Sequence, residues 1–170
     1  MITSISRLDR SGYQFVVKQG QQHGLQPLAL SLSASGNGPV YLYMVVLFLL
    51  LDSNGESLLN TLLASYLVEL PLYFLLKNMI RRQRPCDALA DGIARFEPAD
   101  KFSLPSGHTA AAFVMATSIY FIYPQLFYIA TCWAIGIGLS RIILGVHYPL
   151  DIIAGALLGI ASVVLSLQII

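Results

Sequence analysis

The sequence predicts an all-α protein: a bundle of about five membrane-spanning helices, preceded by a helix lying on the membrane surface. Apolar residues make up 56% of the 170-residue chain and charged residues only 11%. A soluble domain has roughly 45–50% apolar and about 25% charged residues, so this chain carries about half the charge that a water-exposed surface needs. The length fits one domain, residues 1–170.

Each predicted span is an apolar stretch that approaches the roughly 20 residues needed for a helix to cross the hydrocarbon core. The first is the shortest and crosses only if it is tilted, if the bilayer is locally thinned, or if it is lengthened backwards through Gly38 and Pro39. A turn at 52–55 and Pro124 separate neighbouring spans. We expect the spans at Val40–Leu51, Ser57–Leu76, His108–Tyr123, Gln125–Leu144 and Leu150–Ile170.

Residues 1–37 are predicted to form an interfacial segment at the N-terminus. Leu8, Tyr13, Phe15 and Val16 predict a weakly amphipathic helix in the interface, and a disordered tail is the alternative. The segment is polar and gives no sign of a secretory signal.

The charge and cysteine content exclude several classes of function. A net charge of +1 gives no overall field that would attract nucleic acid. Cys86 and Cys132 do not follow the spacing of a metal site, and a disulfide between them is not expected.

The first cluster of polar residues is Lys77-x6-Arg84-Pro85, which follows the second span. Seven helical residues advance by about 700°, which returns to within roughly 20° of the start. If the helix continues past Leu76, Lys77, Arg81 and Arg84 therefore share one face, and Pro85 ends the helix. Converging cations make an anion site; a basic membrane flank is the alternative.

The second cluster is Pro105-Ser106-Gly107-His108, directly before the third span. Ser106 suits a helix cap, and Gly107 lets a ligand approach the backbone. Free amides at a helix start bind anions, so this turn predicts a phosphate cradle with the His108 ring facing the same ligand. A capped helix start with an incidental histidine is the alternative.

The third cluster is Ser140-Arg141-x5-His147-x3-Asp151. Pro149 suits the first turn of the last span, which places Asp151 where its carboxylate can reach back to His147. A carboxylate on one ring nitrogen fixes the tautomer and leaves the other nitrogen as a nucleophile. A capping or interfacial histidine is the alternative.

Together the clusters supply what phosphoryl transfer demands: cations for the equatorial oxygens, an in-line nucleophile and an acid for the leaving oxygen. In this order and with these spacings they resemble the three-part signature of the type 2 phosphatidic acid phosphatase superfamily, over residues 77–151. The resemblance implies that His147 attacks phosphorus and forms a phosphohistidine, that Asp151 orients it, and that His108 protonates the leaving group. It also implies that the phosphate is held by Lys77, Arg84, Ser106, Gly107 and Arg141.

The same resemblance implies that no metal or other cofactor is needed. The acids of the long polar stretch fit this view, because Asp87, Asp91, Glu97 and Asp100 are spread along a loop and are expected to face solvent. Glu69, inside the second span, is either a structural partner of Asn60 or a tyrosine, or a residue that controls headgroup access.

The hydrophobic spans favour a phosphorylated lipid as substrate, with the bilayer as the only other partner and no obligatory protein partner. Resemblance to short bacterial members slightly favours undecaprenyl diphosphate over phosphatidylglycerol phosphate or phosphatidate, and places the site on the outer face of the cytoplasmic membrane. All ten Lys and Arg residues fall on the site's side, which would favour the cytoplasmic face instead. The alternatives are a lipid phosphotransferase and a membrane protein that binds phosphate without hydrolysing it.

Overall fold

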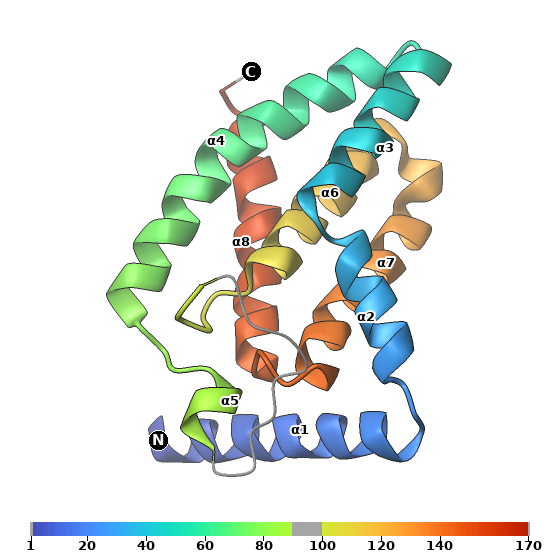
Figure 1. Ribbon diagram of the computed structural model, residues 1–170. Coiled ribbons are helices and arrows are strands. Elements are labelled where there is room, and N and C mark those ends of the chain that lie inside the picture. Colours follow the sequence, from blue (N-terminus) through green and yellow to red (C-terminus); the bar gives the residue numbers. More distant parts are fainter. Residues whose placement is uncertain (1, 90–99, 170) are drawn as a thin grey trace.

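The computed structural model describes residues 2–89 and 100–169, and in these ranges every regular element is a helix. Figure 1 shows a bundle of long helices with one helix lying crosswise beneath one end. The helices are α1 (Ile2–Gln22), α2 (Gln26–Ser35), α3 (Gly38–Leu51), α4 (Gly55–Ile80), α5 (Pro85–Ala88), α6 (Gly107–Ile122), η1 (Pro124–Leu126), α7 (Phe127–Ile143) and α8 (Pro149–Ser166).

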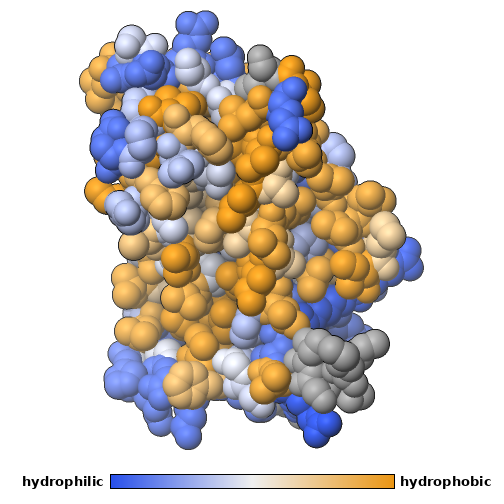
Figure 2. Space-filling view, turned by 180° about the vertical axis from the view of Figure 1, so that it is seen from behind, coloured by the Kyte–Doolittle hydropathy of each residue, from blue (hydrophilic) through white to orange (hydrophobic). Residues whose placement is uncertain are grey.

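Three stretches of the described chain are long and apolar enough to cross a membrane: Gly55–Ala88, Pro124–Ile143 and Pro149–Ser166. Helices α2 and α3 form a fourth candidate as a pair bent by 57°, and α6 is apolar but shorter. Figure 2 shows apolar side chains over most of the middle of one face, with hydrophilic side chains gathered towards its two ends. The chain is therefore a helical membrane protein with three to four candidate spans; the count of five stays a prediction, because it depends on counting α6.

Helix α8 packs most closely against α6 (Figure 1). Two glycines one turn apart in α8 make this approach possible. A Cβ at Gly155 would lie 2.5 Å from the carbonyl oxygen of Ser106, and one at Gly159 would overlap the carbonyl oxygen of Ala110. Small residues let helix backbones approach closely in membranes, so this pair sets the distance between the two helices that carry the second and third clusters.

Helix α1 has one buried face and one exposed face, and it packs on the connection between α7 and α8; its place in the membrane interface stays a prediction. Asp9 and Tyr13 are buried, whereas Leu8 and Phe15 are 73% and 64% exposed. A Cβ at Gly20 would meet the Ile143 side chain at 2.8 Å. One face of α1 therefore packs against the bundle, and an apolar strip beside it, with Leu8 and Phe15, is exposed.

The expectation of one helix running from Lys77 to Arg84 is wrong. Helix α4 ends at Ile80, and Arg81 has φ 49°, in the left-handed region. Arg81 is exposed and donates from Nε to the carbonyl oxygen of Asn78 at 2.8 Å. The chain turns there, so Arg81 does not join the anion site, and Arg84 reaches it from the extended N-cap position of α5.

Candidate active site

A cavity of about 340 Å³ lies at the α1 end of the bundle, where the three clusters meet. Five of the eight predicted site residues line it: Arg84, Gly107, His108, Arg141 and His147. Lys77, Ser106 and Asp151 lie just behind these residues. The other lining residues are Leu30, Ser33, Ala34, Asn37, Tyr73 and Asp100.

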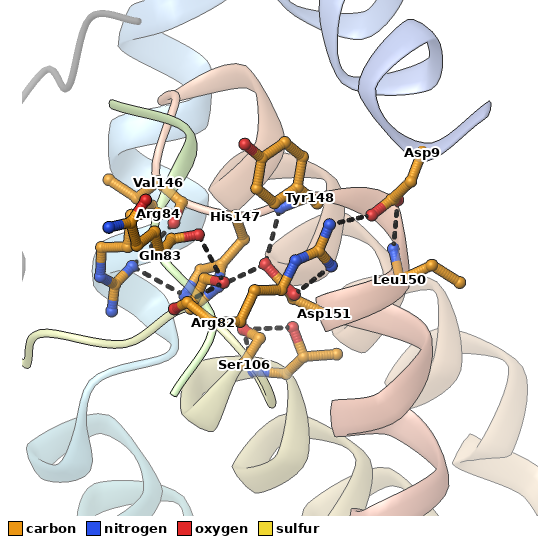
Figure 3. Close-up of polar contacts among 12 residues, drawn as sticks. Asp9, Arg82, Gln83, Arg84, Ser106, Val146, His147, Tyr148, Leu150 and Asp151 are labelled. Carbon is orange, nitrogen blue, oxygen red and sulfur yellow. Dashed lines mark hydrogen bonds and ion pairs between the residues drawn. The ribbon is translucent and has the colours of Figure 1, made fainter. Parts of the chain in front are cut away.

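His147 stands between a carboxylate and a guanidinium (Figure 3). Its Nδ1 lies 3.4 Å from Asp151 Oδ2, and its Nε2 lies 3.3 Å from Arg84 Nη1. The Asp151 carboxylate is itself held, because Oδ2 accepts from the Tyr148 amide at 2.8 Å. The ring therefore has Nδ1 towards its carboxylate partner and Nε2 towards the cations, as the third cluster predicts.

Burial lowers the pKa of His147 to about 4, and the positive charges of Arg84 and Arg141 act in the same direction, against the raising effect of Asp151. The folded protein consequently holds this imidazole neutral near pH 7, with a lone pair available on one nitrogen.

Two cations line the cavity and a third, Lys77, lies just behind its lining, each placed by a different element. Arg84 donates from Nη1 to the Val146 carbonyl at 2.8 Å, which ties it to the loop of His147. Arg141, on the last turn of α7, donates from Nη1 to Ser33 Oγ of α2 at 2.5 Å. Lys77, on the last turn of α4, donates to the Tyr73 hydroxyl at 2.5 Å. Arg84 and Arg141 can thus face an anion in the cavity directly, and Lys77 adds a positive charge behind them.

Asp100 is exposed, as expected of an acid in this loop, but it also joins two of these cations, which the sequence did not predict. Its Oδ2 lies 2.7 Å from Lys77 Nζ and its Oδ1 lies 2.5 Å from Arg84 Nη2. Burial by itself would raise the pKa of this carboxyl, but hydrogen bonds from Lys77, Arg84 and Tyr73 outweigh it and lower the pKa to about 2. Asp87 is exposed as expected, and Asp91 and Glu97 lie outside the described residues.

The second cluster forms the start of α6. Ser106 is its N-cap, and its Oγ accepts from the Thr109 hydroxyl at 2.9 Å, so this hydroxyl serves its own helix. Gly107 lies against the Tyr73 ring, where a Cβ would meet Cε2 at 3.0 Å. The His108 Nε2 lies 2.9 Å from Asn37 Oδ1, so Nε2 carries a proton that it donates to this acceptor.

Several contributors were not found from the sequence. Ser33, Asn37, Tyr73 and Asp100 line the cavity, but each is a common polar residue with no distinctive spacing. Glu69 is 2% exposed inside α4 and lines neither this cavity nor the one beside it. Among the described residues no group of three or more His, Cys, Asp and Glu side chains is arranged to hold a metal ion.

The sequence profile of the PAP2 superfamily matches residues 55–170. The chain belongs to this superfamily. Among curated PAP2 relatives, it is 27% identical over 160 residues to the bacitracin transport permease protein BcrC of Bacillus licheniformis, covering 94% of this chain and 79% of the other. It is 28% identical over 155 residues to an undecaprenyl-diphosphatase of Sulfolobus acidocaldarius, covering 91% and 75%.

A solved PAP2 structure resembles most of this chain. The Aquifex aeolicus LpxE structure superposes with a TM-score of 0.76 at 30% identity, covering 85% of this chain and 86% of the other. Family membership and these relatives make the chain a membrane phosphatase of the PAP2 type acting on lipid phosphates.

Proposed function

We propose that this phosphatase transfers a phosphoryl group from a lipid phosphate or diphosphate to His147 Nε2 and then to water. The observation that carries the proposal is the placement of His147: its Nδ1 lies towards Asp151 and its Nε2 lies towards the cavity that Arg84 and Arg141 border. A nucleophile, its orienting carboxylate and cations for the equatorial oxygens thus converge on one volume.

The reaction has two steps. In the first, the Nε2 lone pair forms an N–P bond while the P–O bond to the leaving group breaks, and His108 gives a proton to the departing oxygen. Since His108 Nε2–H is held by Asn37, Nδ1–H of the protonated ring is the donor. In the second, water attacks phosphorus, His108 takes the proton from that water, and the N–P bond breaks to release inorganic phosphate.

A second cavity beside the site could hold the lipid part of the substrate. This cavity of about 380 Å³ shares Asn37, Gly107 and His108 with the first and continues between α3, α4 and α6. Its remaining lining is Gly36, Gly38, Tyr41, Tyr66, Leu70 and Ala111. We infer that it takes the first part of the lipid chain. Among the candidate substrates we favour undecaprenyl diphosphate, because one relative of the chain is an undecaprenyl-diphosphatase.

Helix α1 is proposed to lie in the membrane interface on the site's side of a five-span bundle. Leu8 and Phe15 are seven residues apart and therefore share one strip of the helix, while Arg7, Arg10 and Lys18 are exposed elsewhere on it. This arrangement suits a helix with lipid on one side and water on the other. The site is placed on the outer face of the cytoplasmic membrane, as the resemblance to bacterial members implies. Labelling of Asp87→Cys, in a protein with Cys86→Ser and Cys132→Ser, in intact cells and in inverted vesicles tests this, and protection in intact cells would contradict it.

The test of the chemistry is trapping of the intermediate. Purified protein in detergent with chelator is mixed with substrate carrying ³²P in the transferred phosphate and quenched in alkali. We expect an acid-labile phosphoprotein that is absent from His147→Ala, which should also lose phosphate release while staying folded. His23→Ala is the matched control, because His23 is exposed on the turn after α1. Full activity of His147→Ala would end this mechanism.

The acid role of His108 is tested with leaving groups. His108→Ala should lose much more activity on a lipid monophosphate, which leaves as an alkoxide, than on an aryl phosphate, because a good leaving group needs no proton. Equal losses on both substrates would contradict the role.

A panel of undecaprenyl diphosphate, phosphatidylglycerol phosphate and phosphatidate separates the substrates by kcat/KM. Product analysis in the same assays separates a hydrolase from a transferase, because only a transferase forms a phosphorylated lipid acceptor.

A further inference from the structure

Arg82 bridges the carboxylate behind His147 to a second carboxylate on α1 (Figure 3). Its Nη1 donates to Asp151 Oδ1 at 2.8 Å, and its Nη2 forms an ion pair with Asp9 Oδ2. Because Asp151 Oδ2 is the oxygen that faces His147 and the Tyr148 amide, both oxygens of this carboxylate are fixed. Arg82 belongs to the first cluster by position but takes no part in lining the cavity.

Asp9 is built into this arrangement rather than placed on the surface. Its side chain is 1% exposed, and its Oδ1 accepts from the Leu150 amide at 2.9 Å, one residue before Asp151. The same carboxylate therefore caps the start of α8 and holds Arg82. A buried charge is costly unless it is paired and hydrogen-bonded, and Asp9 meets both conditions only while α1 is docked.

Aromatic rings fix the remaining freedom of Arg82. Its Cζ lies 4.1 Å from the centroid of the Tyr148 ring, and the Tyr13 ring of α1 lies 5.5 Å from the same ring. Gly12 lets α1 approach, since a Cβ there would meet Pro149 Cγ at 3.3 Å. The guanidinium is held by stacking and by two ion pairs, which is more than a surface pair provides.

We propose that Asp9 and Arg82 are positioning residues of the phosphatase reaction, which set the orientation and the effective charge of Asp151 and through it the basicity of His147. The inference rests on the proposed role of His147 as nucleophile. It gives α1 a part in the chemistry, although α1 lies outside the three clusters.

The charged groups around His147 determine how its pH dependence should change when Asp9 or Arg82 is replaced. Asp151 of α8 faces it directly, Arg84 lies before α5, Arg141 is on α7 and His108 is on α6, and the charges on all four act on this ring. Lys77 of α4 is paired with Asp100. Behind Asp151, Arg82 adds one positive charge and Asp9 one negative charge, and neither contacts the substrate cavity.

Removing these two charges should therefore shift the pH profile in opposite directions. Arg82→Gln leaves two carboxylates without their cation, which favours the imidazolium, so the acid limb of kcat/KM moves to higher pH. Asp9→Asn leaves Arg82 with Asp151 alone, which disfavours the imidazolium, so the limb moves to lower pH. Each shift should be roughly half to one pH unit for a charge at this separation. We also expect kcat to fall about 10–100-fold in Arg82→Gln and less in Arg82→Lys, which restores the charge.

The experiment measures kcat/KM from pH 3.5 to 8 on full-length protein in detergent, normalised to the folded fraction from gel filtration. Arg81→Gln and Asp87→Asn are matched controls, because they remove the same charges from exposed neighbouring positions and should leave the profile unchanged. Opposite shifts support the proposal. Unshifted limbs, or shifts in the same direction, overturn it.

If Arg82→Gln does not fold, Asp9→Asn decides alone: a limb moved to lower pH supports the proposal and an unmoved limb overturns it. Failure of the nucleophile assignment is recognised separately, by phosphate release from His147→Ala.

Discussion

The two parts of α8 are held in the bundle by opposite means. Its first turn is fixed by polar contacts: the Asp151 carbonyl accepts from the Ser106 amide at 3.0 Å, and the Asp151 carboxylate is bound by Arg82 and the Tyr148 amide. Its middle is fixed by shape, since Gly155 and Gly159 bring it against α6. The polar contacts of the first turn fix the position of a charged group, the Asp151 carboxylate. The glycine contacts of the middle fix only the distance between the backbones of α8 and α6. Function should therefore be sensitive at the first turn, and stability along the middle.

The largest expected effect is on activity, at the first turn. Asp151→Asn keeps the shape but removes the charge facing His147 Nδ1, so we expect kcat to fall by about 10²–10⁴-fold, as when a catalytic histidine loses its orienting carboxylate. The variant should retain its thermal transition to within a few degrees. If Asp151→Asn lost activity only in proportion to its unfolded fraction, the first turn of α8 would matter for stability and not specifically for function.

The next effect is on stability as a function of pH. The pKa of His147 is about 4 in the folded chain and about 6.5 in an unfolded one. Between these values the unfolded chain binds more protons, so stability is fully present above about pH 6.5 and falls as the pH drops towards 4, by about 3 kcal/mol. The thermal midpoint of His147→Gln should vary less over this window than that of the wild type. His23→Gln should follow the wild type, and identical curves for all three proteins would contradict the burial effect.

A smaller effect on stability is expected in the middle of α8. At Gly159→Ala the new methyl group meets the Ala110 carbonyl, which is backbone and has no side-chain freedom, so about 1–3 kcal/mol should be lost. Gly136→Ala is the matched control, because a Cβ there lies 3.7 Å from the Leu32 side chain, an ordinary contact. Thermal unfolding in detergent measures both. A Gly159→Ala protein as stable as Gly136→Ala would show that the close approach is not what holds the helix.

The smallest effect concerns the other carboxylate of the site, Asp100. It pairs with Lys77 and Arg84, where a phosphate would bind, and its side chain is 39% exposed, in contrast to the fully buried Asp151. Asp100→Asn removes a competing anion, so inorganic phosphate should inhibit at about 3–10-fold lower concentration. Asp87→Asn serves as control. Weaker inhibition would mean that Asp100 positions the cations instead of competing for them.

The helices were largely predictable because apolar runs and turn residues mark them. The expected span Ser57–Leu76 corresponds to α4, and Gln125–Leu144 to η1 and α7. The break between α1 and α2 was not predicted, because both lie in one stretch without a hydrophobic contrast. The left-handed turn at Arg81 was also missed: arginine has no preference for it, and only the packing of the chain beyond it places Arg84 beside His147.

The convergence of site residues was predictable where they belong to a motif of fixed spacing, while their roles stay a proposal. His147, Arg84 and Arg141 could be assigned to one site because each belongs to a cluster with a set spacing along the sequence. All three line the same cavity. Asp9, Ser33 and Asn37 could not be assigned in this way, since each meets its partner only through tertiary packing across more than 70 residues. The pairing of Asp100 with Lys77 and Arg84 was not predicted for the same reason, because the sequence of a loop does not show which cations an acid will meet.

The match to the superfamily begins at residue 55, yet three side chains ahead of it serve the signature residues: Ser33 for Arg141, Asn37 for His108 and Asp9 for the arginine behind Asp151. A fragment excised at that boundary would contain every signature residue and still be an incomplete enzyme. Chimeras between members should therefore exchange the leading helices together with the bundle, since the two halves were fitted to each other.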